Sequence, residues 1–212
     1  MIRSVVIATA LIALPVHSAE SPRKPTKAEL AAMSVPAEDA ALRVKITGLD
    51  ELDPSVWVST EPFLKGPVDD KFFRAMIDKA TGEVVYQIYF RSTSSRGPLR
   101  LQKGTYLVGG QLKAVSIQRI GGDVSCRQGG CTHFEDFVAD IPRGDLEALT
   151  NEAAAASPTW RMRLFADAIG GSDTEFLRNE TRGFLIAVDR QRATLSFSST
   201  GPASATMTTS DR

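Results

Sequence analysis

Two runs of alternating apolar and polar residues, joined by a loop that contains glycine, constrain the fold of this chain most strongly. The first run covers residues 73–78, the second covers residues 84–91, and the loop is formed by residues 79–82. A period of two places successive side chains on opposite faces of a β-strand. Two such strands around a short glycine-containing loop form a β-hairpin. The sequence therefore predicts an antiparallel sheet that includes this hairpin.

The remaining sequence adds further strands and, near its end, two helices. Strands are predicted at residues 42–47, 56–58, 106–108, 112–120, 131–141, 160–167 and 174–177. Helical spacing occurs at residues 145–156 and again at 180–192, where Asn179 is the expected N-cap. The last helix is expected to bury Thr181, Phe184, Leu185 and Val188. We therefore expect an α+β fold, a mostly antiparallel β-sheet of hairpins with the two late helices packed on it.

The start of the chain has the composition of a secretory signal peptide. Arg3 supplies a positive charge, residues 5–16 are apolar, and Ser18 and Ala19 are the small residues that a signal peptidase recognises. The apolar run is shorter than the roughly twenty residues that a membrane-spanning helix needs. We expect residues 1–19 to be removed by cleavage near Ser18 or Ala19, which leaves a periplasmic or secreted protein without a membrane span.

Composition divides the mature chain into an arm, a domain and a tail. Residues 20–40 carry three prolines and several charges, which predicts a linker or flexible arm with one helical turn around residues 27–33. Residues 41–195 contain the apolar patterning, and their length suits a single α+β domain. Residues 196–212 are rich in serine, threonine and alanine, and we expect this tail to be disordered.

Cys126 and Cys131 are the only cysteines of the chain. A close pair of cysteines in an exported protein is typical of a disulfide. Gly129 and Gly130 lie between them and permit the positive φ angles of a tight reversal. We therefore expect a disulfide at the tip of a hairpin. The alternatives are weaker, because a redox pair usually has two intervening residues rather than four and a zinc site needs further ligands.

Charge and motif content disfavour several classes of function. The chain has 25 Lys and Arg residues and 25 Asp and Glu residues, so it lacks the basic excess that non-specific nucleic-acid binding requires. It contains no Gly-x-Ser-x-Gly motif and no phosphate-binding loop. The glycine pairs at 109–110, 121–122 and 170–171 are interpreted as hairpin turns. We predict no metal site and no cofactor.

Three carboxylates are the candidates for catalysis. Glu135 shares one face of the predicted strand 131–141 with His133, whereas Asp136 and Asp140 lie on the opposite face. Hydrolases that act on glycans use two carboxyl groups about 5 to 10 Å apart. Glu135 with Asp136 or Asp140 would form such a pair if a cleft brought them together. A carboxylate-based hydrolase of the cell envelope is therefore the alternative function.

Arginines near the end of the chain are the candidates for ligand binding. Arg161 and Arg163 project from one face of the predicted strand 160–167, and Arg182 follows in the last helix. Guanidinium groups pair with carboxylates and phosphates through a fork of N–H donors. Arg161, Arg163 and Arg182 are therefore candidates for binding an anionic ligand or an acidic partner. The competing interpretation is that they pair with local acids on a solvated surface.

Three segments carry a likeness to known proteins: residues 80–89, Cys126 and Cys131 with Glu135, and residues 183–185. Together they resemble a loose group of bacterial exported proteins of uncharacterised function. The resemblance covers roughly residues 42–192. It implies a periplasmic setting, but it implies no activity and supplies no catalytic residues.

These observations favour a soluble periplasmic protein that binds something and catalyses no reaction. His133 is the only histidine after the signal peptide, and both cysteines are expected to be paired, so few side chains remain for catalysis. A small ligand could bind between the sheet and its helices. An envelope protein could instead add a strand to an exposed sheet edge. The sequence leaves the ligand, the partner and the oligomeric state open.

Overall fold

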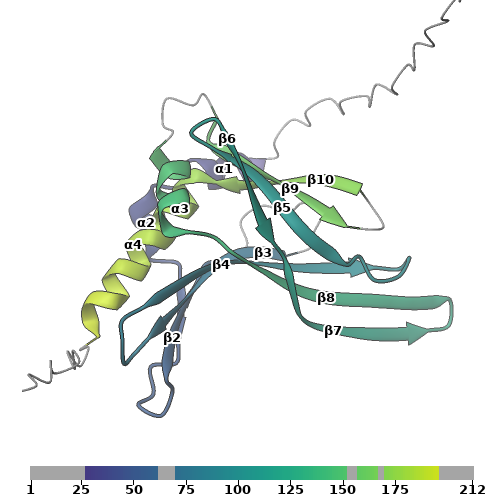
Figure 1. Cartoon of the computed structure of the whole chain (residues 1–212), viewed down its shortest axis with the longest axis horizontal. Helices are drawn as coiled ribbons and strands as arrows, with labels where there is room; N and C mark the ends of the chain where they lie inside the picture. Colours follow the sequence, from purple (N-terminus) through teal and green to yellow (C-terminus); the bar gives the residue numbers. More distant parts are fainter. Residues whose placement is uncertain (1–26, 62–69, 152–156, 167–169, 196–212) are drawn as a thin grey trace, which may run out of the picture.

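The computed structural model describes residues 27–61, 70–151, 157–166 and 170–195, which form two antiparallel sheets and four helices (Figure 1). The predicted signal peptide and the predicted C-terminal tail lie outside the described residues, as do residues 20–26 of the predicted arm. The expected α+β class is confirmed, because the described residues are mostly antiparallel sheet with two late helices packed on it. In this part of the chain, no helix has the length and apolar character needed to cross a membrane.

The larger sheet has six strands in the order β1-β2-β3-β4-β8-β7, and all neighbours are antiparallel. The predicted hairpin is confirmed as β3 and β4, which pair from Asp70 opposite Arg91 to Ile77 opposite Val84. Gly82 has a φ of 73° in the turn between them. The strands are β1 (Lys45–Thr47), β2 (Ser55–Ser59), β3 (Asp70–Asp78), β4 (Val84–Ser94), β7 (Gln118–Arg127) and β8 (Gly130–Asp140).

The smaller sheet has four strands in the order β10-β9-β5-β6. These are β5 (Leu101–Val108), β6 (Gln111–Ser116), β9 (Thr159–Ala166) and β10 (Gly170–Leu177). The prediction of one strand at 112–120 was wrong, because the chain changes sheets at Ile117. The N–H of Ile117 donates to the Gln102 carbonyl at 2.9 Å, and the next residue, Gln118, already pairs with Val138 of β8. The segment stays extended through this change, so its residue pattern indicates a single strand.

The helices are α1 (Lys27–Met33), α2 (Ala37–Ala41), α3 (Arg143–Asn151) and α4 (Arg178–Thr194). The long helix α4 packs against β2 and β3 on the inner face of the larger sheet, and it also contacts β10. The smaller sheet covers another part of that face (Figure 1). Helices α2 and α3 pack in turn on α4. The core therefore lies between the larger sheet on one side and α4 with the smaller sheet on the other.

Phe73 of β3 joins these layers. Its ring is fully buried and its centroid lies 6.3 Å from that of Trp160 in β9, 5.4 Å from Phe176 in β10 and 5.5 Å from Phe184 in α4. Trp160 and Phe176 stack on each other at 4.5 Å. Removing a buried aromatic ring of this kind typically costs about 3–5 kcal/mol of stability. One side chain thus contacts both sheets and the long helix.

Part of the segment predicted to be a linker packs against the domain. Within residues 20–40 the structure places α1 and most of α2, and α2 lies directly on α4. Gly183 permits this approach, because a Cβ there would lie 2.6 Å from the Ala37 carbonyl oxygen and 2.7 Å from the Ala40 Cβ. Ala40 and Ala41 are buried in the contact. The packed domain therefore begins before the boundary expected at residue 41.

The start of α4 differs from the prediction in one respect. Leu177 occupies the N-cap position without a side-chain cap, so the prediction that Asn179 caps this helix was wrong. Asn179 instead donates from Nδ2 to the Val35 carbonyl at 3.0 Å, because the α1–α2 connection lies beside it. The predicted buried stripe is confirmed, since all four of its residues are buried: Thr181, Phe184, Leu185 and Val188.

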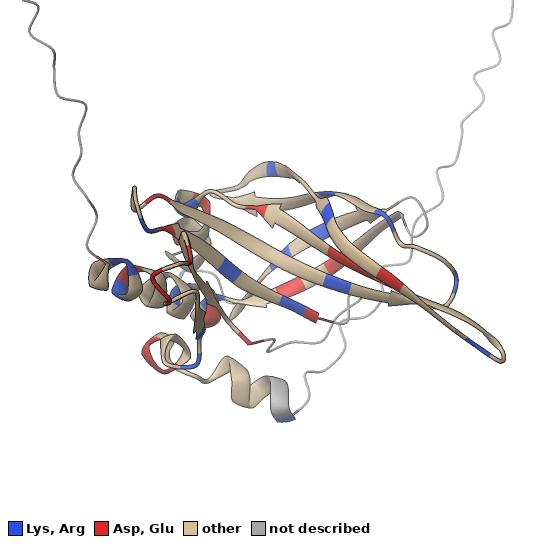
Figure 2. Ribbon diagram, turned by 90° about the horizontal axis from the view of Figure 1, so that it is seen from below, with Lys and Arg blue, Asp and Glu red and all other residues tan. Residues whose placement is uncertain are grey.

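The predicted disulfide is confirmed at the tip of the β7–β8 hairpin. Cys126 and Cys131 are bonded to each other and are direct cross-strand partners. Gly129 and Gly130 have φ angles of 122° and 142° in the reversal between them. Residues 122–130 are exposed, and the β7–β8 hairpin projects beyond the rest of the larger sheet (Figure 2).

The three glycine pairs interpreted as hairpin turns have different roles. Gly109 and Gly110 do form the turn between β5 and β6. The interpretation of residues 121–122 was wrong, because these glycines lie inside β7, next to a register shift between Arg119 and Gly121. A Cβ at Gly122 would lie 2.8 Å from the Phe134 carbonyl oxygen, which explains the absence of a side chain there. Residues 170–171 begin β10.

Replacing Gly183 with alanine should push α2 away from α4, because the new methyl group would overlap backbone atoms of α2. We expect the free energy of unfolding to fall by about 1–3 kcal/mol. Gly144→Ala in α3 is the matched control, since a Cβ there would meet open space. This control should be neutral or stabilising by up to about 1 kcal/mol. Urea denaturation measures both variants, and equal effects would contradict the role assigned to Gly183.

Candidate ligand-binding site

A pocket of about 240 Å³ lies on the smaller sheet. The alternation of β9 explains its composition, because Trp160 and Met162 point into the core while Arg161 and Arg163 point to the outer face. Two of the three arginines predicted to bind a ligand therefore lie in one pocket. The complete lining is Thr105, Tyr106, Leu107, Leu112, Arg161, Arg163 and Asp173.

Arg163 is held in place by Asp173, its cross-strand partner in β10. Its Nε lies 2.6 Å from Oδ1 of Asp173, and its Nη2 lies 3.0 Å from Oδ2, which is a two-pronged ion pair. The hydrogen bonds from Arg163 keep the pKa of Asp173 below its ordinary value, and the charge of Arg161 contributes in the same direction. Asp173 is therefore ionised at neutral pH, and it fixes the orientation of the Arg163 guanidinium.

Arg161 differs from Arg163 because its guanidinium makes no ion pair or hydrogen bond with the residues that the structure describes. Beside it are Leu107, which is 57% exposed, and Leu112, which is 70% exposed. These two leucines are cross-strand partners in β5 and β6. The pocket thus combines the Arg161 guanidinium, whose cross-strand partner is the exposed Glu175, with an apolar surface that is available to a hydrocarbon group.

Arg182, the third predicted ligand-binding residue, lies elsewhere. It is exposed on α4 and does not line the pocket. The sequence reasoning also missed Leu107 and Leu112, although a signal was present. A turn at residues 109–110 makes positions 107 and 112 cross-strand partners, and this follows from hairpin geometry alone.

Glu135, the first of the candidate catalytic carboxylates, points into the protein and is buried. The backbone N–H groups of Leu99 and Arg100 both donate to its Oε2, the latter at 3.2 Å. Its Oε1 lies 3.2 Å from Nε of Arg119. Glu135 therefore anchors the loop that leads into β5.

Asp136 and Asp140 lie on the opposite face of β8. Arg91 donates to Asp136 from Nε at 2.8 Å and from Nη2 at 3.2 Å, and this pairing holds the pKa of Asp136 below its usual value. The Tyr89 hydroxyl also donates to Asp136. Asp140 accepts a hydrogen bond from Gln87 at 2.7 Å. The structure does not bring the three candidate carboxylates together, and each of them already has a partner within the protein.

The outer face of the larger sheet carries aromatic and charged side chains that engage one another. Phe72 stacks on Tyr89 with ring centroids 4.4 Å apart. The guanidinium of Arg74 lies 5.0 Å from the Trp57 ring and 5.7 Å from the Tyr89 ring. Over the part of the chain that the structure describes, basic and acidic residues are interspersed (Figure 2). This face is therefore a weaker candidate for a ligand than the pocket that contains Arg161.

A buried polar network, missed by the sequence reasoning, links the two sheets to α4. Lys71 of β3 donates to the Thr174 hydroxyl of β10 at 2.9 Å. Thr60, after β2, donates to Oε1 of Glu180 in α4 at 3.0 Å. Burial raises the pKa of Glu180 to about 8, although the hydroxyl of Thr60 and the charge of Lys71 oppose that shift. These four side chains are buried, so we assign the network to the core.

A signal for this network was present in the sequence. Lys71 stands two residues before Phe73 and so continues the inward-facing side of the same alternation. Glu180 stands four residues before Phe184 and lies on the buried side of its helix. A charged residue at an inward position indicates a buried partner, because an unpaired charge in a core is costly.

Comparisons with known proteins give no match. No protein family, curated protein or solved structure is similar to this chain at a significant level. Within the described residues, no three His, Cys, Asp or Glu side chains gather in the way that a metal site requires. What the protein binds therefore has to be inferred from its own residues.

Replacing Glu180 with glutamine should change how stability depends on pH. Because the pKa of about 8 in the folded state exceeds the ordinary value of 4.5, the folded protein retains a proton that the unfolded chain releases as the pH rises. Stability of the wild-type protein relative to Glu180→Gln must therefore fall between these two pH values. We expect a difference on the order of a few kcal/mol between pH of about 5 and about 9. Chemical denaturation at both pH values measures it, and a constant offset would contradict the buried carboxyl group.

Proposed function

We propose that this protein is a soluble periplasmic or secreted binding protein without catalytic activity. Its ligand is a small organic anion with an apolar part, and it binds in the Arg161 pocket on the smaller sheet. The observation that carries this proposal is the Arg161 guanidinium, which has no ion-pair partner among the described residues and lies beside two exposed leucines.

The chemistry of the pocket supports this class of ligand. A carboxylate or phosphate can accept hydrogen bonds from the forked guanidinium of Arg161, and Arg163 adds positive potential from a fixed position. The apolar part of the ligand would cover Leu107 and Leu112, and each square ångström of apolar surface buried contributes about 25 cal/mol. A volume of about 240 Å³ lies below the range of about 300–1,000 Å³ that is typical of pockets for drug-sized molecules. The pocket therefore suits a small ligand.

The start of the chain and its disulfide support the proposed location. Residues 1–19 have the features of a secretory signal peptide. The bond between Cys126 and Cys131 is of the kind that persists in oxidising compartments such as the bacterial periplasm. Both features point to a protein that works outside the cytoplasm.

The alternative function, a carboxylate-based hydrolase of the cell envelope, has less support. A pair of carboxyl groups must flank the bond that is cleaved. Glu135 lies on one face of β8 and is held by backbone N–H groups, whereas Asp136 and Asp140 lie on the other face. This arrangement favours the binding protein over the hydrolase.

Substituting Arg161 should weaken binding of anionic ligands. We expect saturable binding of octanoate by isothermal titration calorimetry and no binding of octanol, because the alcohol lacks the charge. Arg161→Ala should weaken octanoate binding about tenfold or more, since a hydrogen bond to a charged group contributes about 1.5–3 kcal/mol. Asp173→Asn should strengthen binding, because it removes a negative charge from the pocket and releases Arg163.

Arg182→Ala is the matched control, since Arg182 is an exposed arginine outside the pocket. It should leave the dissociation constant for octanoate unchanged. Equal binding of octanoate and octanol, or equal losses in the Arg161 and Arg182 variants, would reject the pocket as an anion site. Native mass spectrometry of protein purified from its own host provides a second test, and we expect a retained organic anion that the Arg161→Ala variant lacks.

A further inference from the structure

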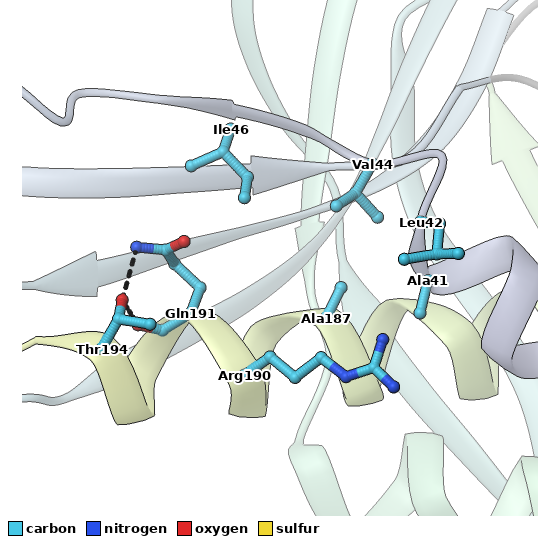
Figure 3. Close-up of a pocket in the computed structure, with 8 residues that line it drawn as sticks. All are labelled: Ala41, Leu42, Val44, Ile46, Ala187, Arg190, Gln191 and Thr194. Carbon is cyan, nitrogen blue, oxygen red and sulfur yellow. Dashed lines mark hydrogen bonds between the residues drawn. The ribbon is translucent and has the colours of Figure 1, made fainter.

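The two edge strands of the larger sheet, β1 and β7, differ in the length of open edge that they offer. Strand β1 has three residues, and Gly48 follows it with a φ of 76°. A pocket of about 150 Å³ lies between the β1 segment and α4, and Val44 and Ile46 point across it toward the helix (Figure 3). Strand β7 has ten residues and, among the described residues, pairs only with β8 (Figure 1). Because residues 122–127 are all exposed, this edge is a place where another strand can pair.

The pairing of β7 with β8 identifies the backbone groups that β7 leaves free. In an antiparallel ladder, hydrogen-bonded pairs of residues alternate with non-hydrogen-bonded pairs, whose Cα atoms are about 4.5 Å apart rather than about 5.5 Å. The Cα atoms of Cys126 and Cys131 are 4.0 Å apart, so this pair is of the non-hydrogen-bonded kind. Val124 opposite His133, two residues along, is then of the same kind. The N–H and C=O groups of Val124 and Cys126 therefore point away from β8, toward the open edge.

Asp123 and Arg127 add one charge of each sign to this edge. The N–H of Val124 donates to Oδ1 of Asp123 at 2.7 Å, so the carboxylate satisfies a donor that a carbonyl oxygen of an added strand would otherwise satisfy. Arg127 lies on the same face of β7 as Asp123, because alternate residues of a strand point to the same side. Its guanidinium makes no ion pair or hydrogen bond with the residues that the structure describes. The edge therefore combines free backbone groups with an acid and a base on one face.

A second copy of β7 complements this edge in one register. If two copies pair in antiparallel fashion about Ser125, Asp123 of each copy lies directly opposite Arg127 of the other. Val124 of each copy then lies opposite Cys126 of the other, and each of these pairs can exchange two backbone hydrogen bonds. Pairing about Asp123 instead would place the two aspartates opposite each other, which is unfavourable. Charge therefore favours antiparallel pairing about Ser125.

The projecting hairpin leaves room for this pairing. In the same register, Gln128 and Gly129 of one copy would lie beside Gly122 and Gly121 of the other, where no side chain obstructs the reversal. Because the β7–β8 hairpin projects beyond the rest of the larger sheet, the two domains would lie at opposite ends of the joined hairpins (Figure 2). A two-fold interface requires one surface patch to be complementary to itself, and β7 meets this requirement about Ser125.

We propose that the protein forms a reversible two-fold dimer through residues 123–127 of β7, in which the larger sheets of two copies join into one continuous sheet. The paired segment is short, and protein pairs with small interfaces associate weakly. We therefore expect the dimer to form at high micromolar concentration. The Arg161 pocket is on the smaller sheet, so this inference is independent of the proposed ligand.

Sedimentation equilibrium on the purified mature protein tests this proposal. The average mass of the wild-type protein should rise toward that of two chains as its concentration reaches the high micromolar range. Asp123→Arg and Arg127→Asp should each weaken the dimer about tenfold or more, because two opposite-charge pairs become like-charge pairs. Mixing the two variants should restore the dimer, because opposite charges then face each other at both pairs. A wild-type protein that keeps the mass of one chain throughout, or single variants that associate as well as the wild type, would overturn the proposal.

Ser125→Cys tests the register, because the two-fold axis would place this residue opposite itself. Mild oxidation should give a covalent dimer on a non-reducing gel, with the bond between the two introduced cysteines identified by mass spectrometry. Thr47→Cys is the matched control, since Thr47 is exposed on β1, the other edge strand of the larger sheet, and this variant should remain a single chain. Equal cross-linking of the two variants, or cross-linking of Thr47→Cys alone, would reject the β7 interface. All substituted positions are exposed in the structure, so the variants should fold, and thermal melting monitored by circular dichroism verifies this.

Discussion

The packing of α4 on the inner face of the larger sheet is the contact on which the rest of the structure depends. Phe184 of α4 lies against Phe73, and Tyr86 packs edge-on against the Phe184 ring. The helix and the smaller sheet share this face, so the smaller sheet must turn its apolar side inward and its Arg161 side outward. Beyond the helix, β1 is the edge strand of the larger sheet, and its one apolar residue, Ile46, is partly exposed. The outward position of the Arg161 pocket therefore follows from where α4 lies.

Alternation in the sequence predicted the faces of strands well and their neighbours less well. The β3–β4 hairpin and the disulfide turn depend on contacts close in sequence, and the buried stripe of α4 follows from helical periodicity. All three were confirmed. The change of sheet at Ile117 and the docking of α2 depend on contacts far apart in sequence. The two-residue alternation indicates which face of its strand a side chain occupies. It carries no information about which sheet the strand joins.

The candidate site shows the same division. The sequence could place Arg161 and Arg163 on the same face, because residues two apart on one strand point to the same side. Arg182 could not be placed, because its position depends on how α4 packs on the sheets. The buried network of Lys71 and Glu180 was overlooked because charged residues are expected on the surface. Within a regular alternation, the position of a charged residue indicates whether it is buried better than its residue type does.

The disulfide has a consequence for the pairing of β7 with β8. Sliding one strand past the other by a single residue would exchange the two faces of the sliding strand. In β8, that exchange would turn the exposed side of Asp136 toward the core and expel Glu135 from its backbone partners. Strand β7 is exposed and interrupted by Gly121 and Gly122, so side-chain packing holds it weakly. By fixing Cys126 opposite Cys131, the covalent bond sets the register that the side chains of β7 alone would leave open to slippage.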